Sequence, residues 1–226
     1  MSDQSALDGA TTCLLRLAAA VALGVEDQIR RAAGEALAAG LPEGWVDELI
    51  LQSVLMAGWP RALVAMGIWR SVSGSVAPPA DADGDYSRAG DWVARGERTC
   101  RQVYGSNYDK LRANVRSLHP ALDAWMVAEG YGRTLSRPAL GLALRELCTV
   151  VQTAVLDVPQ QLHSHLRGAL NAGAAVPQID QALRLVRPGM TDQRWRQVER
   201  LWSEVREGAR DMGQDPAGGE GWQDAD

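Results

Sequence analysis

Apolar residues recur at intervals of three and four along most of the chain, the pattern of helices that bury one face. Residues 11–23 and 26–39 carry this pattern, and Gly24 and Gly40 follow them as residues that readily end helices. The apolar positions of a third predicted helix are Trp45, Val46, Leu49, Ile50 and Val54. The N-terminal part of the chain is therefore predicted to be helical.

The segment Gly58-Trp59-Pro60 breaks this pattern, and a fourth helix is predicted to reach about Val72. Residues 73–90 are rich in Ser, Gly, Pro, Ala and Asp, a composition typical of a linker. Residues 91–104 and 107–130 again have the helical pattern. These shifts divide the chain into a first unit at 1–72, a linker at 73–90 and a second unit at 91–208.

The second unit contains a predicted helical hairpin. Its first helix has an apolar face formed by Leu140, Leu144, Leu147, Val151 and Val155. We expect Ser136 to mark the start of this helix and Asp157 to cap the next one, which Gly173 ends. Thr191 starts a last helix, and residues 209–226 are predicted to be a disordered tail.

The two units match each other when the chain is shifted by 133 positions without a gap. Identical pairs include Leu14/Leu147, Val25/Val158, Gln28/Gln161, Ala36/Ala169, Leu37/Leu170, Gly40/Gly173, Asp47/Asp180, Arg61/Arg194, Trp69/Trp202 and Val72/Val205. Turn residues and apolar positions coincide, as a duplicated fold requires. The sequence therefore predicts a tandem repeat.

From Gly96 to about Leu185 the chain resembles γ-carboxymuconolactone decarboxylase, of the wider alkylhydroperoxidase-like superfamily. The matching segments are 101–108, Tyr131-Gly132, 136–140, Arg145 and the run from Leu162 to Gly173. The resemblance implies an all-α, tandem duplicated alkylhydroperoxidase-like fold. It also implies a homo-oligomer, here a trimer with a pseudo-hexameric arrangement, whose site lies near a contact between chains.

The resemblance also bears on chemistry. Peroxidases of this superfamily have a glutamate, two cysteines and a histidine at fixed spacing, and these positions are Glu146, Val158, Gln161 and His165 here. Both thiols are missing, so thiol-based peroxidase activity is not expected. The corresponding residues of the first unit are Cys13, Val25, Gln28 and Ala32, which leaves the second unit as the candidate for catalysis.

His165 is the first candidate for proton transfer, with Glu146 holding its other ring nitrogen. A core histidine and a surface ion pair between Glu146 and Arg145 are the alternatives. His163, two residues away, is expected on a different face of the helix. Candidate substrate-binding residues are Arg137, Arg145, His163, Tyr104, Tyr131 and Trp59. Ordinary surface charge or core packing remains the alternative for each of them.

The hypothesis is a cofactor-free carboxy-lyase acting on a carboxylated lactone or related cyclic carboxylate, such as a natural-product ring. Trp59 would then belong to a composite site built from both units or from two chains. The alternative is a non-catalytic binding or assembly protein on the same fold. A net charge of −5 argues against nucleic-acid partners, and three scattered cysteines fit a reducing cytoplasm. No membrane span, metal site or cofactor is expected.

Overall fold

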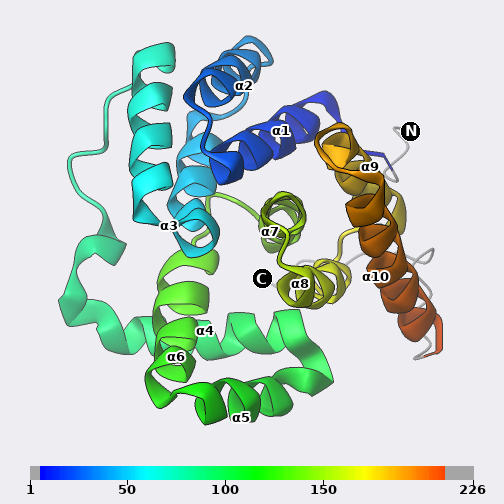
Figure 1. Ribbon diagram of the computed structural model, residues 1–226. Helices are drawn as coiled ribbons and strands as arrows, with labels where there is room; N and C mark the ends of the chain where they lie inside the picture. Colours follow the sequence, from blue (N-terminus) through cyan, green and yellow to red (C-terminus); the bar gives the residue numbers. More distant parts are fainter. Residues whose placement is uncertain (1–5, 212–226) are drawn as a thin grey trace, which may run out of the picture.

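The computed structural model describes residues 6–211. Every regular element in this range is helical, and α7 lies at the centre, seen almost along its axis in Figure 1. The main helices are α1 (Gly9–Leu23), α2 (Glu26–Ala38), α3 (Glu43–Ser73), α4 (Ala89–Tyr104), α5 (Tyr108–Leu118), α6 (Pro120–Trp125), α7 (Leu142–Leu156), α8 (Pro159–Asn171), α9 (Val176–Val186) and α10 (Asp192–Asp211). The all-α prediction is confirmed.

The duplication is visible in the helix boundaries. The bounds of α7 and α8 are those of α1 and α2 moved by 133 positions, and α9 begins 133 positions after α3. Helix α3 is kinked at Gly58, whose φ of 81° is left-handed. In the second half, the short helix η5 (Arg187–Gly189) and a turn separate α9 from α10 near the same place. The shift found in the sequence therefore describes the fold.

Residues paired by this shift also make the same contacts. The indole N–H of Trp69 donates to Asp47 Oδ1 at 3.0 Å, and that of Trp202 donates to Asp180 Oδ1 at 2.6 Å. The first bond connects the parts of α3 before and after its kink, and the second connects α9 to α10. Identical residues in register thus support the two halves in the same way.

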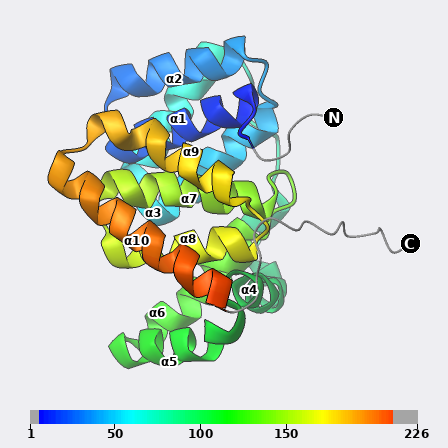
Figure 2. The ribbon, with the colours of Figure 1, turned by 90° about the vertical axis from the view of Figure 1, so that its right-hand side faces the viewer.

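The two halves share one hydrophobic core. Helix α7 packs against α1, α8 and α9, so it is buried on most sides. Leu14, Leu17 and Val21 of α1 and Val150 and Val151 of α7 are at most 1% exposed. The halves are therefore one packed body, as the view of Figure 2, turned by 90°, also shows.

A helical segment without a counterpart in the described first half separates the two units. It contains η1 (Ala82–Gly84), η2 (Tyr86–Arg88), α4, η3 (Gly105–Asn107), α5, α6 and η4 (Met126–Leu135). The repeated part of the second unit therefore begins near Leu142, and α4–η4 precede it as an addition. This addition has a small core of its own, made by Cys100, Val103, Tyr108, Tyr131 and Leu135.

Helix α4 and η4 touch through their backbones. A Cβ on Gly96 would lie 2.0 Å from the carbonyl oxygen of Val127, and a Cβ on Gly132 would lie 1.8 Å from that of Trp92. Only glycine fits at both contacts. This close approach sets the position of Tyr131, which lies between the two contact points of η4.

Several local predictions were wrong. Residues 107–130 are not one helix, because extended backbone at His119 ends α5 and a π-helix, η4, follows α6. The Ser136 hydroxyl donates to the carbonyl of Gly132 instead of capping α7. Asp157 adopts a left-handed φ of 59° as the residue that ends α7, while Val158 precedes α8. The left-handed conformation predicted for Gly173 is confirmed, with φ of 96°.

The predicted linker is fixed to the protein by side-chain contacts. Asp83 is 9% exposed and accepts hydrogen bonds from the Trp92 indole and from Arg95 and Arg137. In the predicted tail, residues up to Asp211 belong to α10, and the rest lies outside the described residues. Among the described helices, α3 alone has the length and composition of a membrane span, a test that buried core helices also pass.

Candidate functional site

The hairpin of α7 and α8 brings Glu146 and His165 together. Nδ1 of His165 lies 2.8 Å from Oε2 of Glu146. Glu146 is fully buried, and His165 is 6% exposed. The contact expected between these two residues is therefore present, while their role in catalysis remains a prediction.

Helix α8 has the residues that this contact requires. Gly168 lies one turn after His165, and a Cβ there would be 2.6 Å from Glu146 Oε2 and 2.7 Å from Val103 Cγ1. The missing side chain leaves room for the carboxylate between α7, α8 and α4. Asn171 at the end of α8 donates to the carbonyl oxygen of Val103 at 2.8 Å, which fixes α8 against α4.

Neutral groups surround the carboxylate. Burial raises the pKa of Tyr104 and Cys100 to about 12, and it raises the pKa of Tyr131 well above its usual value. The charge of Glu146 contributes in the same direction at all three groups. The two tyrosine rings pack edge to face with centroids 6.0 Å apart. Both phenols therefore stay protonated near neutral pH and can donate hydrogen bonds.

The contact with Glu146 determines which ring nitrogen of His165 is free to bind another group. A carboxylate beside Nδ1 accepts the proton on that nitrogen and directs the lone pair or second proton to Nε2. Nε2 has no hydrogen-bond partner among the described residues, and the His165 side chain is 8% exposed. The second carboxylate oxygen of Glu146, Oε1, is also buried and has no hydrogen-bond partner among the described residues. The geometry suits a histidine that exchanges a proton through Nε2.

Arg145 lies in the contact between the two halves. It is fully buried, and its nitrogens donate to Glu48 Oε2 at 2.6 Å, the Leu140 carbonyl at 2.8 Å and Gln52 Oε1 at 3.3 Å. Burial is the largest influence on this guanidinium, and it lowers its pKa. All three nitrogens have protein acceptors, so this placement does not support the predicted binding of a substrate carboxylate by Arg145.

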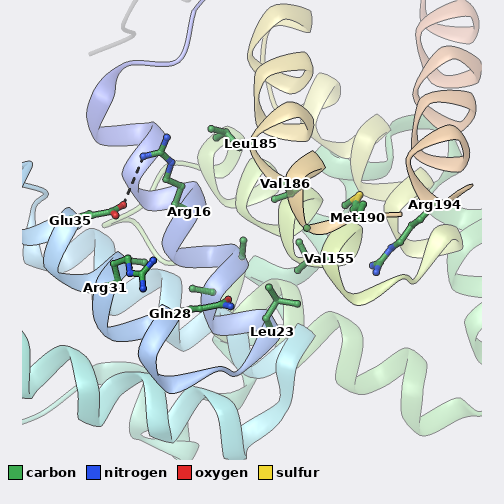
Figure 3. Close-up of a pocket in the computed structure, with 14 residues that line it drawn as sticks. Arg16, Leu23, Gln28, Arg31, Glu35, Val155, Leu185, Val186, Met190 and Arg194 are labelled. Carbon is green, nitrogen blue, oxygen red and sulfur yellow. Dashed lines mark ion pairs between the residues drawn. The ribbon is translucent and has the colours of Figure 1, made fainter. Parts of the chain in front are cut away.

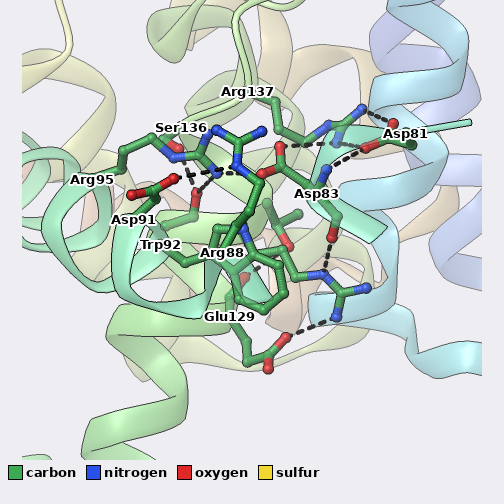
Figure 4. Close-up of polar contacts among 12 residues, drawn as sticks. Asp81, Asp83, Arg88, Asp91, Trp92, Arg95, Glu129, Ser136 and Arg137 are labelled. Carbon is green, nitrogen blue, oxygen red and sulfur yellow. Dashed lines mark hydrogen bonds and ion pairs between the residues drawn. The ribbon is translucent and has the colours of Figure 1, made fainter. Parts of the chain in front are cut away.

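Arg137 continues the same ionic network toward the linker. It donates to both oxygens of Glu48 at 2.9 Å, to Asp81 at 2.7 and 2.9 Å, and to Asp83 at 3.2 Å. Figure 4 shows the contacts of Arg137 with Asp81 and Asp83. The Arg137 guanidinium also lowers the pKa of Asp81 to about 2. Both predicted carboxylate clamps are thus engaged with carboxylates of the protein itself.

Trp59 and Arg137 line a large pocket of about 790 Å³ between α3, the linker and the α6–η4 segment. Neither His165 nor Glu146 lines this pocket or the other main pockets of the described chain. Within one chain, Trp59 therefore does not share a pocket with His165. A composite site across two chains remains a prediction.

His163 lies on a different face of α8, as its spacing from His165 predicts. It lines a pocket of about 220 Å³ together with Arg167, Asn171 and residues of α10 such as Glu204. The two histidines therefore belong to different surroundings. Four of the predicted site residues, Glu146, His165, Tyr104 and Tyr131, lie together, whereas Arg137, Arg145, His163 and Trp59 lie elsewhere.

The first half has a different pocket where the second half has His165. Ala32, the counterpart of His165, lines a cavity of about 280 Å³ with Gln28, Arg16, Arg31 and Arg194 (Figure 3). Its floor is apolar and its rim is mostly cationic, and Arg16 and Glu35 approach only to 3.9 Å. This cavity lies between the two halves and has no histidine among its lining residues.

Two residues important for this arrangement were missed from the sequence. Gly168 makes room for the carboxylate, and Glu48 binds both Arg137 and Arg145. Glu48 stands between the apolar positions Val46, Leu49 and Ile50 of a predicted helix, which was a usable signal. A charged residue that is buried in this way requires a partner of opposite charge.

Comparison with known proteins agrees with this fold. The profile of the carboxymuconolactone decarboxylase family matches residues 1–71 and 120–204, and the second segment covers the second repeat together with α6 and η4. The protein belongs to the carboxymuconolactone decarboxylase family, as a tandem-repeat member. A search of curated proteins found no significant match.

The residues described hold no group of three or more His, Cys, Asp or Glu side chains arranged for a metal ion.

Proposed function

We propose that this protein is a cofactor-free carboxy-lyase that acts on a carboxylated lactone or a related cyclic carboxylate. Family membership supports a decarboxylase-like or related function at the level of the family. The observation that carries the proposal is the buried contact of 2.8 Å between His165 Nδ1 and Glu146 Oε2. Because Nδ1 is engaged with Glu146, Nε2 is the nitrogen that would exchange a proton with the substrate.

In the proposed reaction, the bond between the ring carbon and the carboxylate breaks and carbon dioxide leaves. The electron pair moves into the ring carbonyl system as an enolate. Protonated His165 then delivers a proton from Nε2 to carbon, and Glu146 stabilises the imidazolium. The proton is replaced from water, so each turnover consumes one carboxylate and one proton and yields carbon dioxide and the protonated ring.

Tyr104 and Tyr131 are proposed to donate hydrogen bonds to the enolate oxygen. Burial keeps both phenols protonated far above neutral pH, so they act as donors throughout the working range. A donor placed where negative charge develops lowers the barrier most. The arginine clamps expected for the substrate carboxylate are not part of this assignment, since Arg137 and Arg145 are bound to Glu48.

A non-catalytic binding or assembly protein is the second candidate. The observation in its favour is that His165 and Glu146 line none of the main pockets of the described chain. A lyase therefore has to open this site, or complete it at a contact between chains. We also propose that the protein forms a trimer and that it is located in the cytoplasm.

The test is carbon dioxide release from γ-carboxymuconolactone and from a set of larger carboxylated lactones. We expect His165→Ala to lower kcat by about 10²- to 10⁴-fold, the usual contribution of general acid catalysis. Glu146→Gln should lower kcat, because a neutral amide stabilises the imidazolium less than a carboxylate does. His163→Ala is the matched control on another face of α8 and should retain activity. Failure of the unaltered protein to release carbon dioxide from any of these rings would favour the binding protein.

A further inference from the structure

The largest pocket of the described chain is separate from the His165–Glu146 pair. Its volume is about 790 Å³, within the range of pockets that enclose small molecules. Helix α3 forms one wall with Leu51, Leu55 and Trp59. The linker and the α6–η4 segment form the others, with Tyr86, Trp125 and Arg133 among their residues.

Three large aromatic side chains line the pocket. Trp59, Trp125 and Tyr86 come from three different elements, and each is more than 60% exposed. Large aromatic rings gain free energy when their faces are covered, and they stack well on flat ring systems. Three such rings around one hollow are therefore suited to a planar apolar ligand.

The charged side chains that line the pocket are all engaged in ion pairs within the protein. Asp47 is bound to Arg70 at 2.5 Å and Glu129 to Arg133 at 2.9 Å. Asp81 and Asp83 are both bound to Arg137. Each carboxylate and each guanidinium that lines the pocket therefore has a partner of opposite charge. An ionic ligand would have to break one of these pairs, so the pocket favours an uncharged ligand.

Some hydrogen-bond donors that line the pocket have no partner among the described residues. The indole N–H groups of Trp59 and Trp125 make no hydrogen bond with a described residue. Arg70 Nε is buried and likewise has no hydrogen-bond partner among the described residues. The two indoles are exposed, whereas Arg70 Nε is buried, and a buried donor gains most from an acceptor that enters with the ligand. The ligand should therefore have oxygen acceptors such as ring carbonyls.

We propose that this pocket binds an uncharged, flat ring system of two or more fused rings with carbonyl or hydroxyl oxygens as acceptors. Trp59 and Trp125 stack on the ligand from opposite elements, and the donors at the pocket edge bind its oxygens. The site shares no residue with the His165–Glu146 pair, and the inference does not rest on the proposed lyase activity.

The test uses Nile red, an uncharged fused-ring dye with a ring carbonyl, added to the full chain and followed by its fluorescence. We expect saturable binding of one dye per chain. Trp59→Ala and Trp125→Ala should each raise its Kd at least tenfold. The matched control is Leu118→Ala, which alters a 76% exposed apolar side chain on α5 outside the pocket. Its Kd should equal that of the unaltered protein.

Three results would overturn the proposal. The first is an absence of saturable binding, and the second is binding that neither tryptophan substitution weakens. The third is equally tight binding of the anionic dye anilinonaphthalene sulfonate, because it would contradict the preference for an uncharged ligand.

Light scattering on the same samples separates a ligand pocket from a contact between copies. We expect Trp59→Ala to keep the mass of the unaltered protein while it loses the dye. A change to a smaller species together with loss of the dye would instead show that a second copy closes the pocket, and it would overturn the proposal.

Discussion

Gly168 lies against the carboxylate of Glu146, so close that a Cβ would stand 2.6 Å from Oε2. The carboxylate is fully buried and has His165 as its hydrogen-bond partner. Any side chain at position 168 must therefore move the group that orients His165. The smallest residue of α8 thus controls the geometry of the candidate site.

Gly168→Ala should keep the fold but displace Glu146 from His165. Overpacking of a buried site costs about 1–3 kcal/mol, and alanine recovers about 0.5–1 kcal/mol through its helix propensity. We therefore expect a modest loss of stability in urea unfolding. The imidazole nitrogen shifts of His165, measured by NMR, should change because its partner has moved.

Gly34→Ala is the control for this experiment. Gly34 is a helical glycine of α2, and a Cβ added there would meet nothing within 4 Å. The same substitution at this position should raise stability by about 0.5–1 kcal/mol and leave His165 unchanged. Equal behaviour of the two variants would show that the close contact at Gly168 has no consequence.

Glu48→Ala should be strongly destabilising. Glu48 is 5% exposed and pairs with both Arg137 and Arg145, so its removal leaves Arg145 buried without its carboxylate. Breaking a buried ion pair in this way costs about 3–5 kcal/mol. Asp109→Ala is the comparison, because its pair with Arg101 is 3.8 Å long and exposed. Urea unfolding that gives the same small change for both would contradict the structure.

The three cysteines should differ in reactivity. Cys100 and Cys148 are fully buried, and burial raises the pKa of each thiol to about 12 from an ordinary 9.0. Cys13 is only partly buried. At pH 8, Ellman's reagent should therefore label Cys13 first and the other two only as the protein opens. Rapid labelling of all three thiols in the folded protein would contradict this order.

The raised pKa values of Cys100 and Cys148 also predict how the stability of the protein falls at alkaline pH. Their folded pKa values are raised, so their contribution is fully present below pH 9 and is lost as the pH rises toward 12. Cys148→Ala should therefore flatten the loss of stability in this window. Thermal unfolding followed by circular dichroism measures this change, and an unaltered alkaline limb in Cys148→Ala would contradict it.

The repeated Trp–Asp bond gives a comparison between the halves. Trp69→Phe removes one donor from Asp47, which keeps Arg70 at 2.5 Å. Trp202→Phe removes the donor of Asp180, whose other partner, Arg206, is 3.9 Å away. Loss of a hydrogen bond to a charged group costs about 1.5–3 kcal/mol. We expect urea unfolding to give the larger cost for Trp202→Phe, and a reversed order would contradict the structure.

Much of the fold followed from local signals in the sequence. The gapless shift between the units placed the boundaries of α1 and α2 on those of α7 and α8, because turn residues such as Gly40 and Gly173 recur in register. The spacing of Glu146 and His165 placed them on the two helices of one hairpin. Such signals lie in the order of residues along the chain, so they can be read without knowing the rest of the fold.

The errors have a different origin. Ser136 and Asp157 have the chemistry of helix caps, but the Ser136 hydroxyl bonds to Gly132 and Asp157 lies 3.3 Å from Arg194. Arg145 also has a partner that the sequence did not indicate, Glu48, which lies 97 positions away in the chain. Contacts over such distances depend on tertiary packing, which no local pattern contains. The π-helix of η4 likewise follows from its packing on α4.

The fusion of two units also sets a stoichiometry. One half of each chain contains Glu146 and His165, and the corresponding positions of the other half are Cys13 and Ala32. Any assembly of this chain, whatever its size, must therefore hold one such pair for every two repeated units. In an assembly of separate single units, each unit could keep or lose the pair independently. Here the peptide bond fixes the composition, so the half without the pair is free to diverge while it remains present in a constant ratio.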